Sequence, residues 1–218
     1  MKKIPLVFVL DRTSGALTSD VRPESAWVPA GEGIATVKHD GSATRWKDGR
    51  LWKRYDRKLD KAAQRRFDQG HALDPLDENL FKTPPAGFEP CQAQADPVTF
   101  HWPGWVPVDA ADPADQWHRQ ALEGTSPADF EEGATYELVG PALSRNPYEL
   151  ARHELWKHGR DVVDVPDRSF EGLRAFLAPL QAEGLVFHHP DGRMAKIRRK
   201  DYGLFWVQED PRRQRRGW

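Results

Sequence analysis

The sequence predicts an α+β domain built on antiparallel sheets flanked by a few helices. Several short runs rich in apolar and β-branched residues have the length of strands and are separated by turn residues. Two of these runs lie on either side of Asp48-Gly49, a dipeptide typical of a hairpin turn. Only residues 169–183 show apolar side chains at clear helical spacing. Strands joined by short turns, with few helices between them, favour antiparallel pairing.

The first half of the chain contains the first predicted strands. Residues 4–10 form an apolar run of seven that contains Pro5 and is closed by Asp11, which favours a first strand over a signal peptide. A second apolar run, 34–37, ends at Lys38. Residues 43–46 and 51–55 then form the two arms of the predicted hairpin, and a polar, helix-compatible stretch follows.

The second half alternates between loops and short elements. Residues 83–115 are dense in proline and aromatic residues, which predicts an ordered loop with short strands. Strands are expected at 134–139, 162–165, 184–188 and 194–198. Ser169 can cap the helix 169–183, which Pro179 should kink or shorten.

Length and composition predict one soluble domain. The 218 residues contain no repeat or clear linker, so we expect a single domain over residues 1–210 and a basic tail at 211–218. We expect the protein to be a monomer. Cys91 is the single cysteine, which excludes a disulfide framework and fits a reducing, cytoplasmic compartment. No apolar stretch approaches about 18 residues, so no membrane partner is expected.

The charge distribution indicates a polyanionic partner although the net charge is only -1. Residues 43–66 contain ten lysines and arginines against three aspartates, and residues 192–218 contain nine against three acidic residues. A basic segment on each side of an acidic middle is compatible with nucleic-acid binding along one face. Ordinary solvated charge is the alternative interpretation.

The sequence Lys38-His39-Asp40-Gly41 contains the first candidate for chemistry. Taking an ammonium group out of water is costly, so burial lowers the pKa of a lysine, and a lowered pKa makes its amine a nucleophile. A lysine at the end of a buried strand is therefore a candidate nucleophile. Asp40 can orient or balance the charge, and Gly41 gives the backbone freedom to turn. The same residues also fit an ordinary strand that ends in a turn.

Two carboxylates and a basic strand could complete a nucleotide site. Glu137 lies inside a predicted strand, and Glu183 lies at a helix-to-strand junction before Gly184; either could bind a ribose hydroxyl or a magnesium ion, or simply face water. The basic strand contains Lys196, Arg198 and Lys200, which would share one face of a strand. That face would suit phosphate oxygens; alternatively, the three residues would form a basic edge that resists aggregation.

Two further patterns give weaker indications. The hairpin arm 51–56 is expected to present one cationic face, which could point toward Lys38. His188 and His189 could bind a metal, but adjacent residues on a strand point to opposite faces, so surface or packing roles are favoured.

Together these stretches resemble the covalent nucleotidyltransferase superfamily, and in particular the small ATP-dependent RNA ligases of vertebrates, phages and bacteria. The lysine motif is Lys38 to Ala43, and the arginine motif is Leu51 to Asp56. The Trp105 loop (103–108), the Glu137 string (136–141, followed by Asn146-Pro147-Tyr148), the Glu183 motif and the final Lys196 motif follow in order.

The resemblance implies a nucleotidyltransferase (ATP-grasp-like) domain and a mechanism. It implies that Lys38 attacks ATP, aided by Mg²⁺ or Mn²⁺, and that the AMP passes to RNA with a 5′-phosphate and a 3′-hydroxyl end. It further implies nucleotide contacts from the following residues, with Glu137 and Glu183 also as metal ligands: Thr36, Val37, Lys38, Arg54, Glu137, Glu183, Lys196, Arg198 and Lys200.

One departure and two alternatives stay open. Ligases place two lysines two positions apart in the last motif, whereas this chain has Arg198 at the second position and Lys200 two further on, so either could contact phosphate. The chain also leaves no length for an oligonucleotide-binding barrel, so none is expected. One alternative is a DNA ligase or capping enzyme, although the Trp105 loop and the Glu137 string favour an RNA ligase; the other is a non-catalytic RNA-binding module with the same fold.

Overall fold

The computed structural model describes residues 3–11 and 13–204, and the expected basic tail at 211–218 lies outside this range. The described residues cluster into two compact units, each made of separate stretches of sequence. The first unit contains residues 3, 42–138 and 151–156, and the second contains 4–11, 13–41, 139–150 and 157–204. The predicted α+β class with antiparallel sheets and few helices is confirmed.

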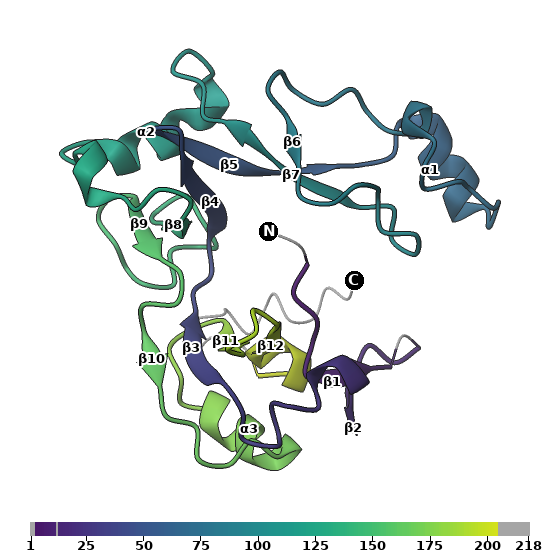
Figure 1. Ribbon diagram of the computed structural model, residues 1–218, viewed down its shortest axis with the longest axis vertical. Helices are drawn as coiled ribbons and strands as arrows, with labels where there is room; N and C mark the ends of the chain where they lie inside the picture. Colours follow the sequence, from purple (N-terminus) through teal and green to yellow (C-terminus); the bar gives the residue numbers. More distant parts are fainter. Residues whose placement is uncertain (1–2, 12, 205–218) are drawn as a thin grey trace. The chain divides into compact units, whose positions relative to one another are not determined.

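The first unit is built on a six-stranded sheet with the order β6-β7-β5-β4-β8-β9. The predicted hairpin is confirmed: Asp48 and Gly49 both adopt positive φ (54° and 69°), as a tight two-residue turn requires. Figure 1 shows these strands with the helices of the unit. Their bounds are β4 Ser42–Lys47, β5 Arg50–Arg57, β6 Glu89–Pro90, β7 Trp102–Pro107, β8 Thr135–Val139, β9 Glu154–Lys157, α1 Lys61–Asp68, α2 Gln116–Leu122, and the short 3-10 helices η2 Glu78–Leu80, η3 Pro113–Asp115 and η4 Pro127–Asp129.

Aromatic side chains form much of the first unit's core. Trp46, Leu51 and Tyr136 are buried together on one side of the sheet. A second cluster, which includes Phe100 and Trp102, packs against α1. The proline-rich segment therefore forms short strands held by its tryptophans, as the sequence predicts.

The second unit is built on a four-stranded sheet with the order β10-β3-β11-β12, in which each neighbouring pair is antiparallel. Helix α3 packs against it, because Leu173 and Leu177 are buried with the core side chains of β3, β11 and β12 (Figure 1). The bounds are β1 Phe8–Leu10, β2 Leu17–Val21, β3 Ile34–Lys38, β10 Val162–Val163, α3 Phe170–Leu177, β11 Gly184–His188, β12 Met194–Arg198, and the 3-10 helices η1 Pro23–Ser25 and η5 Arg199–Tyr202.

Several details differ from the sequence-based expectation. The strand expected at 4–10 is regular only over Phe8–Leu10. Its partner Leu17–Val21 has no strand signal in the sequence because it is largely polar. Helix α3 begins at its Ser169 cap as predicted but ends at Leu177, since Pro179 cannot continue the hydrogen-bond ladder. Strand β12 ends at Arg198, so Lys200 does not share the strand face of Lys196.

Across residues 3–11 and 13–204, the structure has no helix that is both long and apolar enough to cross a membrane.

Candidate active site

Lys38 is the last residue of β3, and strand pairing places it in a row with Gly184 and Arg198. Lys38 pairs with Gly184 on β11, and Gly184 pairs with Arg198 on β12. The next row on the same face contains Thr36, Val186 and Lys196. Because side chains alternate across a strand, Lys38, Lys196 and Arg198 emerge on one face of the sheet. We name this face the lysine face.

The opposite face of the same sheet is the core of the second unit. Ala35, Leu185 and Ile197 each lie next in sequence to a residue of the lysine face, and each is at most 1% exposed. The alternation of apolar and polar residues in three strands thus fixes which side chains face the core. It leaves the cationic side chains together on the other side, as predicted for Lys196 and Arg198.

Glu183 is the ion-pair partner of Lys38. The Lys38 ammonium donates a hydrogen bond to the Glu183 carboxylate, and both side chains are about one-fifth exposed (22% and 17%). The backbone holds Glu183 there: its N–H donates to the Lys38 carbonyl (3.0 Å), and its carbonyl accepts from the Arg199 N–H (2.9 Å). The structure thus brings Lys38 and Glu183 together, while the predicted ribose or metal role of Glu183 stays a prediction.

Gly184 is required by the close approach of two backbones. A Cβ atom at this position would collide with the carbonyl oxygen of Ile197 and the Cα atom of Arg198 on the neighbouring strand. The absence of a side chain also leaves the middle of the row between Lys38 and Arg198 flat.

Lys196 is a cation held at an energetic cost. Burial, and then the positive charges of Arg198 and Lys38, lower the pKa of Lys196 from 10.5 to about 8. The negative charges of Glu183 and Asp201 oppose this shift only in part. An anion placed on the lysine face would relieve the same repulsion, so the site is suited electrostatically to a phosphate group.

Arg198 and Lys200 have different surroundings. The Arg198 guanidinium donates two hydrogen bonds to the buried Asp201 carboxylate (2.7 and 3.0 Å), which balances its charge. Lys200 lies in η5, is exposed, and lines a pocket beside the turn between β1 and β2. The expectation that all three basic residues share one strand face is therefore wrong for Lys200.

Asp40 is bound to the loop 139–150 by two hydrogen bonds. Its carboxylate accepts a hydrogen bond from the Ser144 hydroxyl (2.7 Å), and its backbone N–H donates to the Tyr148 hydroxyl (2.6 Å). Ser144, Arg145 and Asn146 all adopt positive φ, a conformation that costs energy for residues with side chains. Gly41 lies at the bend between β3 and β4. Asp40 thus positions the chain after the lysine.

His39 is held by a second contact in the same region. Its Nε2 atom lies 2.9 Å from the Asp161 carboxylate, and its ring contacts the Tyr148 ring edge-on. Partial burial would raise the pKa of Asp161, but hydrogen bonds from His39 and Arg160 outweigh it and lower that pKa. The two residues that follow Lys38, His39 and Asp40, are therefore both held in place.

Thr36 and Val37 point to opposite faces of the second unit's sheet. The buried Thr36 hydroxyl lies on the lysine face, 2.9 Å from His188 Nε2 and 3.3 Å from the Val186 carbonyl. The Val37 side chain points to the opposite face, while its N–H donates to the Asp161 carbonyl (2.9 Å). Burial, and then the charge of His158, lower the pKa of His188, which favours its neutral imidazole form.

The first unit brings Arg54 and Glu137 onto one face of its own sheet. Glu137 on β8 pairs with Ala43 on the central strand β4. On the other side of β4, Thr44 pairs with Lys53 of β5, so the same register places Arg54 opposite Ala43. The small Ala43 side chain thus separates the two. Glu137 is 7% exposed, and the Arg54 guanidinium lies over the Trp105 ring (5.6 Å) and near Cys91 Sγ (3.8 Å).

The expectation of a single cationic face on the arm 51–56 is wrong. Strand alternation places Lys53 on the face opposite Arg54. Lys53 is bound there to the fully buried Asp115 carboxylate (2.5 Å). Lys53 therefore has a structural role, and Arg54 is the basic residue of this arm that stays with Glu137.

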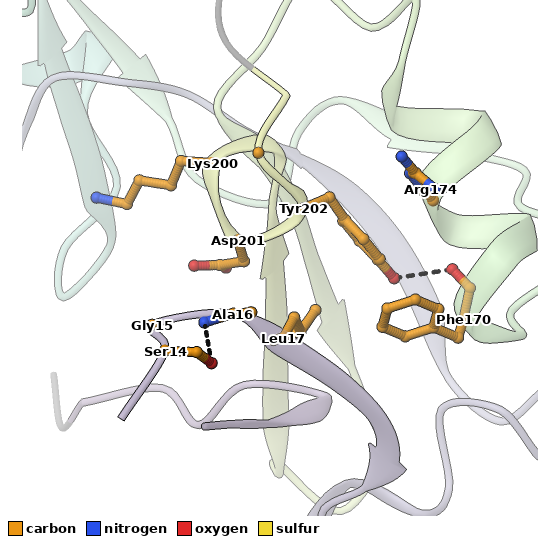
Figure 2. A pocket seen from close by; sticks show the side chains of 10 residues that line it. Ser14, Gly15, Ala16, Leu17, Phe170, Arg174, Lys200, Asp201 and Tyr202 are labelled. Atoms are coloured by element: carbon orange, nitrogen blue, oxygen red, sulfur yellow. Dashed lines mark hydrogen bonds between the residues drawn. The ribbon is translucent and has the colours of Figure 1, made fainter. Parts of the chain in front are cut away.

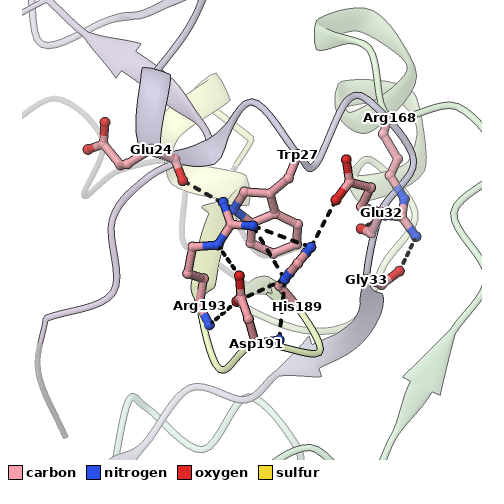
Figure 3. Close-up of polar contacts among 8 residues, drawn as sticks. All are labelled: Glu24, Trp27, Glu32, Gly33, Arg168, His189, Asp191 and Arg193. Carbon is pink, nitrogen blue, oxygen red and sulfur yellow. Dashed lines mark hydrogen bonds and ion pairs between the residues drawn. The ribbon is translucent and has the colours of Figure 1, made fainter.

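His189 has the packing role expected from its position. Figure 3 shows its ring between two carboxylates, with Glu32 at 2.9 Å and Asp191 at 2.8 Å, and edge-on to Trp27. The backbone N–H of Arg193 and further hydrogen bonds lower the pKa of Asp191 to about 2, although slight desolvation opposes them. These contacts close the hairpin between β11 and β12.

The structure also identifies residues that the sequence reasoning did not assign to the site. Ser144, Tyr148, Asp161 and Asp201 each hold a residue of the site through a hydrogen bond. The string Asn146-Pro147-Tyr148 is part of the family resemblance, and this was the only signal that could have identified Tyr148. Within the described part of the chain, no group of three or more histidine, cysteine or carboxylate side chains is arranged to hold a metal ion.

Comparison with known proteins matches one family repeatedly. A family model described as RNA ligase 1 matches residues 123–217. RNA ligase 1 of Rattus norvegicus is 30% identical over 229 aligned residues, which cover 81% of this chain and 69% of the relative. RNA ligase 1 of Mus musculus is 29% identical over 225 residues with the same coverage. RNA ligase 1 of Danio rerio is 29% identical over 205 residues, covering 73% and 63% of the two chains.

Proposed function

Since the chain belongs to the RNA ligase 1 family, we propose that it is an ATP-dependent RNA ligase acting through AMP bound covalently to Lys38. The observation that carries this proposal is the lysine face. It combines a lysine at the end of a strand, a carboxylate bound to its ammonium group, and the cation Lys196 in the next row. We propose that the chain is a nucleotidyltransferase domain.

The first step is attack of the unprotonated Lys38 Nζ atom on the α-phosphorus of ATP. A P–N bond forms, and the bond to the pyrophosphate oxygen breaks with its electron pair. The nitrogen loses a proton as its bond to phosphorus forms, and the hydrogen-bonded Glu183 carboxylate is placed to accept that proton. Lys196, charged at neutral pH, stabilises the α-phosphate oxygens.

The later steps reuse the same residues. A 5′-phosphate oxygen of RNA attacks the lysyl-bound phosphorus, the P–N bond breaks, and Lys38 recovers its proton. The 3′-hydroxyl of the second RNA end then attacks the activated 5′-phosphate, and AMP leaves. Arg54 is proposed to bind phosphate or ribose, and Glu137 to bind a ribose hydroxyl.

A magnesium or manganese ion fits the donors that the chain offers. Mg²⁺ is usually held by one or two carboxylates together with substrate phosphates and water, so a cluster of three protein ligands is not needed. Glu183 on the lysine face is the first candidate donor and Glu137 of the first unit the second. The bound ion would neutralise charge on the phosphate oxygens.

The test is a sealing assay with a panel of ends and nucleotides. We expect joined product from RNA with a 5′-phosphate and a 3′-hydroxyl, in the presence of ATP and Mg²⁺. We expect none with GTP, with 5′-hydroxyl RNA or with the Lys38→Ala variant. Sealing of nicked DNA alone would indicate a DNA ligase, and reaction with GTP alone a capping enzyme; either result would contradict the proposal.

A further inference from the structure

A pocket of about 380 Å³ lies at the edge of the second unit, next to η5 (Figure 2). Its walls come from three segments that are far apart in sequence: the turn between β1 and β2, helix α3, and η5 with the residue after it. The volume lies within the range of small-ligand pockets and would accommodate one nucleotide. The lining residues that matter for its chemistry are Ser14, Phe170, Arg174, Lys200, Asp201 and Tyr202.

Two cationic side chains give the pocket its charge. Lys200 and Arg174 lie on either side of the Tyr202 ring in Figure 2. Lys200 is exposed and makes no ion pair within residues 13–204. Arg174 is 54% exposed, and its contact with Glu171 is long (3.9 Å) and solvent-exposed, so it contributes little and can exchange for a ligand.

The one carboxylate in the lining is already neutralised. Asp201 is nearly buried and accepts hydrogen bonds from the Arg198 guanidinium at 2.7 and 3.0 Å and from the Arg198 N–H at 3.1 Å. Its charge is therefore compensated from the side of the lysine face. An anion in the pocket meets Lys200 and Arg174 without strong repulsion from Asp201.

An aromatic wall lies between the two cations. The rings of Phe170 and Tyr202 contact edge-on, with centroids 4.9 Å apart. The Tyr202 hydroxyl donates to the Phe170 carbonyl (3.0 Å), and burial raises the pKa of Tyr202, so the ring stays neutral and fixed. A wall of this kind, with a cation on each side, suits a nucleotide whose base contacts the rings and whose neighbouring phosphates meet the cations.

The pocket is connected to the nucleophile through Arg198. Arg198 lies in the row of Lys38, two strand spacings away, which is about 10 Å. Its guanidinium binds Asp201 in the pocket lining. A chain of nucleotides whose end lies at Lys38 could therefore reach the pocket along the edge of the same unit.

We propose that this pocket is a binding subsite for a single-stranded RNA substrate, with Lys200 and Arg174 contacting successive phosphodiester groups beside the Phe170–Tyr202 wall. The assignment rests on the proposed function for the identity of the strand. Lys200 is then expected to contact RNA and not the phosphates of ATP, which agrees with its place outside β12.

The test is RNA binding without ATP, measured by fluorescence anisotropy of a short 5′-phosphorylated single strand across a range of salt concentrations. We expect Arg174→Ala and Lys200→Ala each to weaken binding about fivefold and to lower the slope of log K against log salt by about 0.7 to 1. The matched control is Arg152→Ala, which removes an arginine that is 72% exposed and lies outside both basic segments. Arg174→Ala should leave AMP transfer to Lys38 unchanged.

Two results separate this proposal from the proposed function. Unchanged affinity and salt slope in the double variant Arg174→Ala/Lys200→Ala, as in Arg152→Ala, would overturn the subsite whatever the enzyme activity. Loss of RNA binding in the double variant would support the subsite even if the wild-type protein formed no adduct with ATP, a result that would contradict the proposed function alone.

Discussion

Lys38 and Glu183 form an ion pair although 145 positions separate them in the chain. The pair exists because β11 lies beside β3 in antiparallel register, which places the residue before Gly184 next to the end of β3. Glu183 is held at that place by backbone hydrogen bonds to Lys38 and from Arg199. The proposed nucleophile and its proposed proton acceptor are therefore positioned by the sheet itself.

Glu183→Gln tests the role of this carboxylate. The amide can still bind the lysine but takes up a proton poorly, so we expect AMP transfer to Lys38 to slow by about 100-fold. Because the pair is partly exposed, the free energy of unfolding should change by no more than about 1 kcal/mol. Single-turnover adenylation and urea unfolding measure the two effects. Glu171→Gln, an exposed glutamate of α3, is the control, and an equal rate in both variants would contradict the role.

The pKa of Lys196 predicts how ATP binding depends on pH. Lys196 is charged below about pH 8 and neutral above it, so its attraction for the α-phosphate is lost as pH rises through 8. We expect the Kd for ATP to increase several-fold between about pH 7 and 9 in the wild type. Lys196→Arg keeps its charge and should show a much smaller increase. Parallel pH profiles for the two proteins would show that Lys196 does not bind the nucleotide.

The lowered pKa of Lys196 also predicts how the free energy of unfolding depends on pH. The pKa of Lys196 is lower in the folded state than in the unfolded state, so the unfolded chain binds more protons between about pH 8 and 10.5. The contribution of Lys196 to the free energy of unfolding should therefore increase with pH across this window. Urea unfolding of wild type and Lys196→Met measures it as the difference between their pH profiles. A difference that stays constant from pH 7 to 10.5 would contradict the shift.

Arg199→Ala should be strongly destabilising. Arg199 is buried, and its guanidinium donates to the carbonyls of Leu177 (2.9 Å), Ala178 (3.1 Å) and Leu180, at and just after the end of α3. Truncation leaves these acceptors without that donor, at a cost of about 3 kcal/mol. Urea unfolding measures the loss. The neighbouring Lys200→Ala removes an exposed cation and should change stability by less than about 0.5 kcal/mol; equal effects would contradict this assignment.

Tyr148→Phe tests whether the turn after the lysine must be held. It removes the hydroxyl that accepts from the Asp40 N–H (2.6 Å) and should slow AMP transfer about tenfold with little change in the KM for ATP. Tyr55→Phe, which lies in the other unit and contacts Phe88 through its ring, is the matched control. A Tyr148→Phe enzyme as fast as this control would show that the contact has no role in positioning Lys38.

The residues of the lysine face could be predicted because local alternation determines them. Lys38, Lys196 and Arg198 each follow an apolar residue that must face the core, so the sequence determines their side of the strand. Asp201 and Asp161 could not be predicted in the same way, because their partners are set by tertiary contacts. Strand β2 was missed for a similar reason: its side chains are mostly polar, and pairing with β1 defines it.

Strand β5 of the first unit shows where an expectation from alternating residues was wrong. Alternating positions in β5 were expected to collect the basic side chains on one face. Lys53 and Arg54 are adjacent in sequence and so point to opposite faces, and a buried aspartate, Asp115, binds Lys53. Only the register of β4 with β8 and β5 shows that Arg54 and Glu137 lie on either side of Ala43.

The most direct test of the central claim is incubation of the protein with α-labelled ATP and Mg²⁺, followed by a denaturing gel and peptide mass spectrometry. The account predicts one AMP per chain on the peptide that contains Lys38, full labelling of Lys82→Ala, and no label on Lys38→Ala. AMP on another lysine, or no adduct at any pH or with either Mg²⁺ or Mn²⁺, would contradict it.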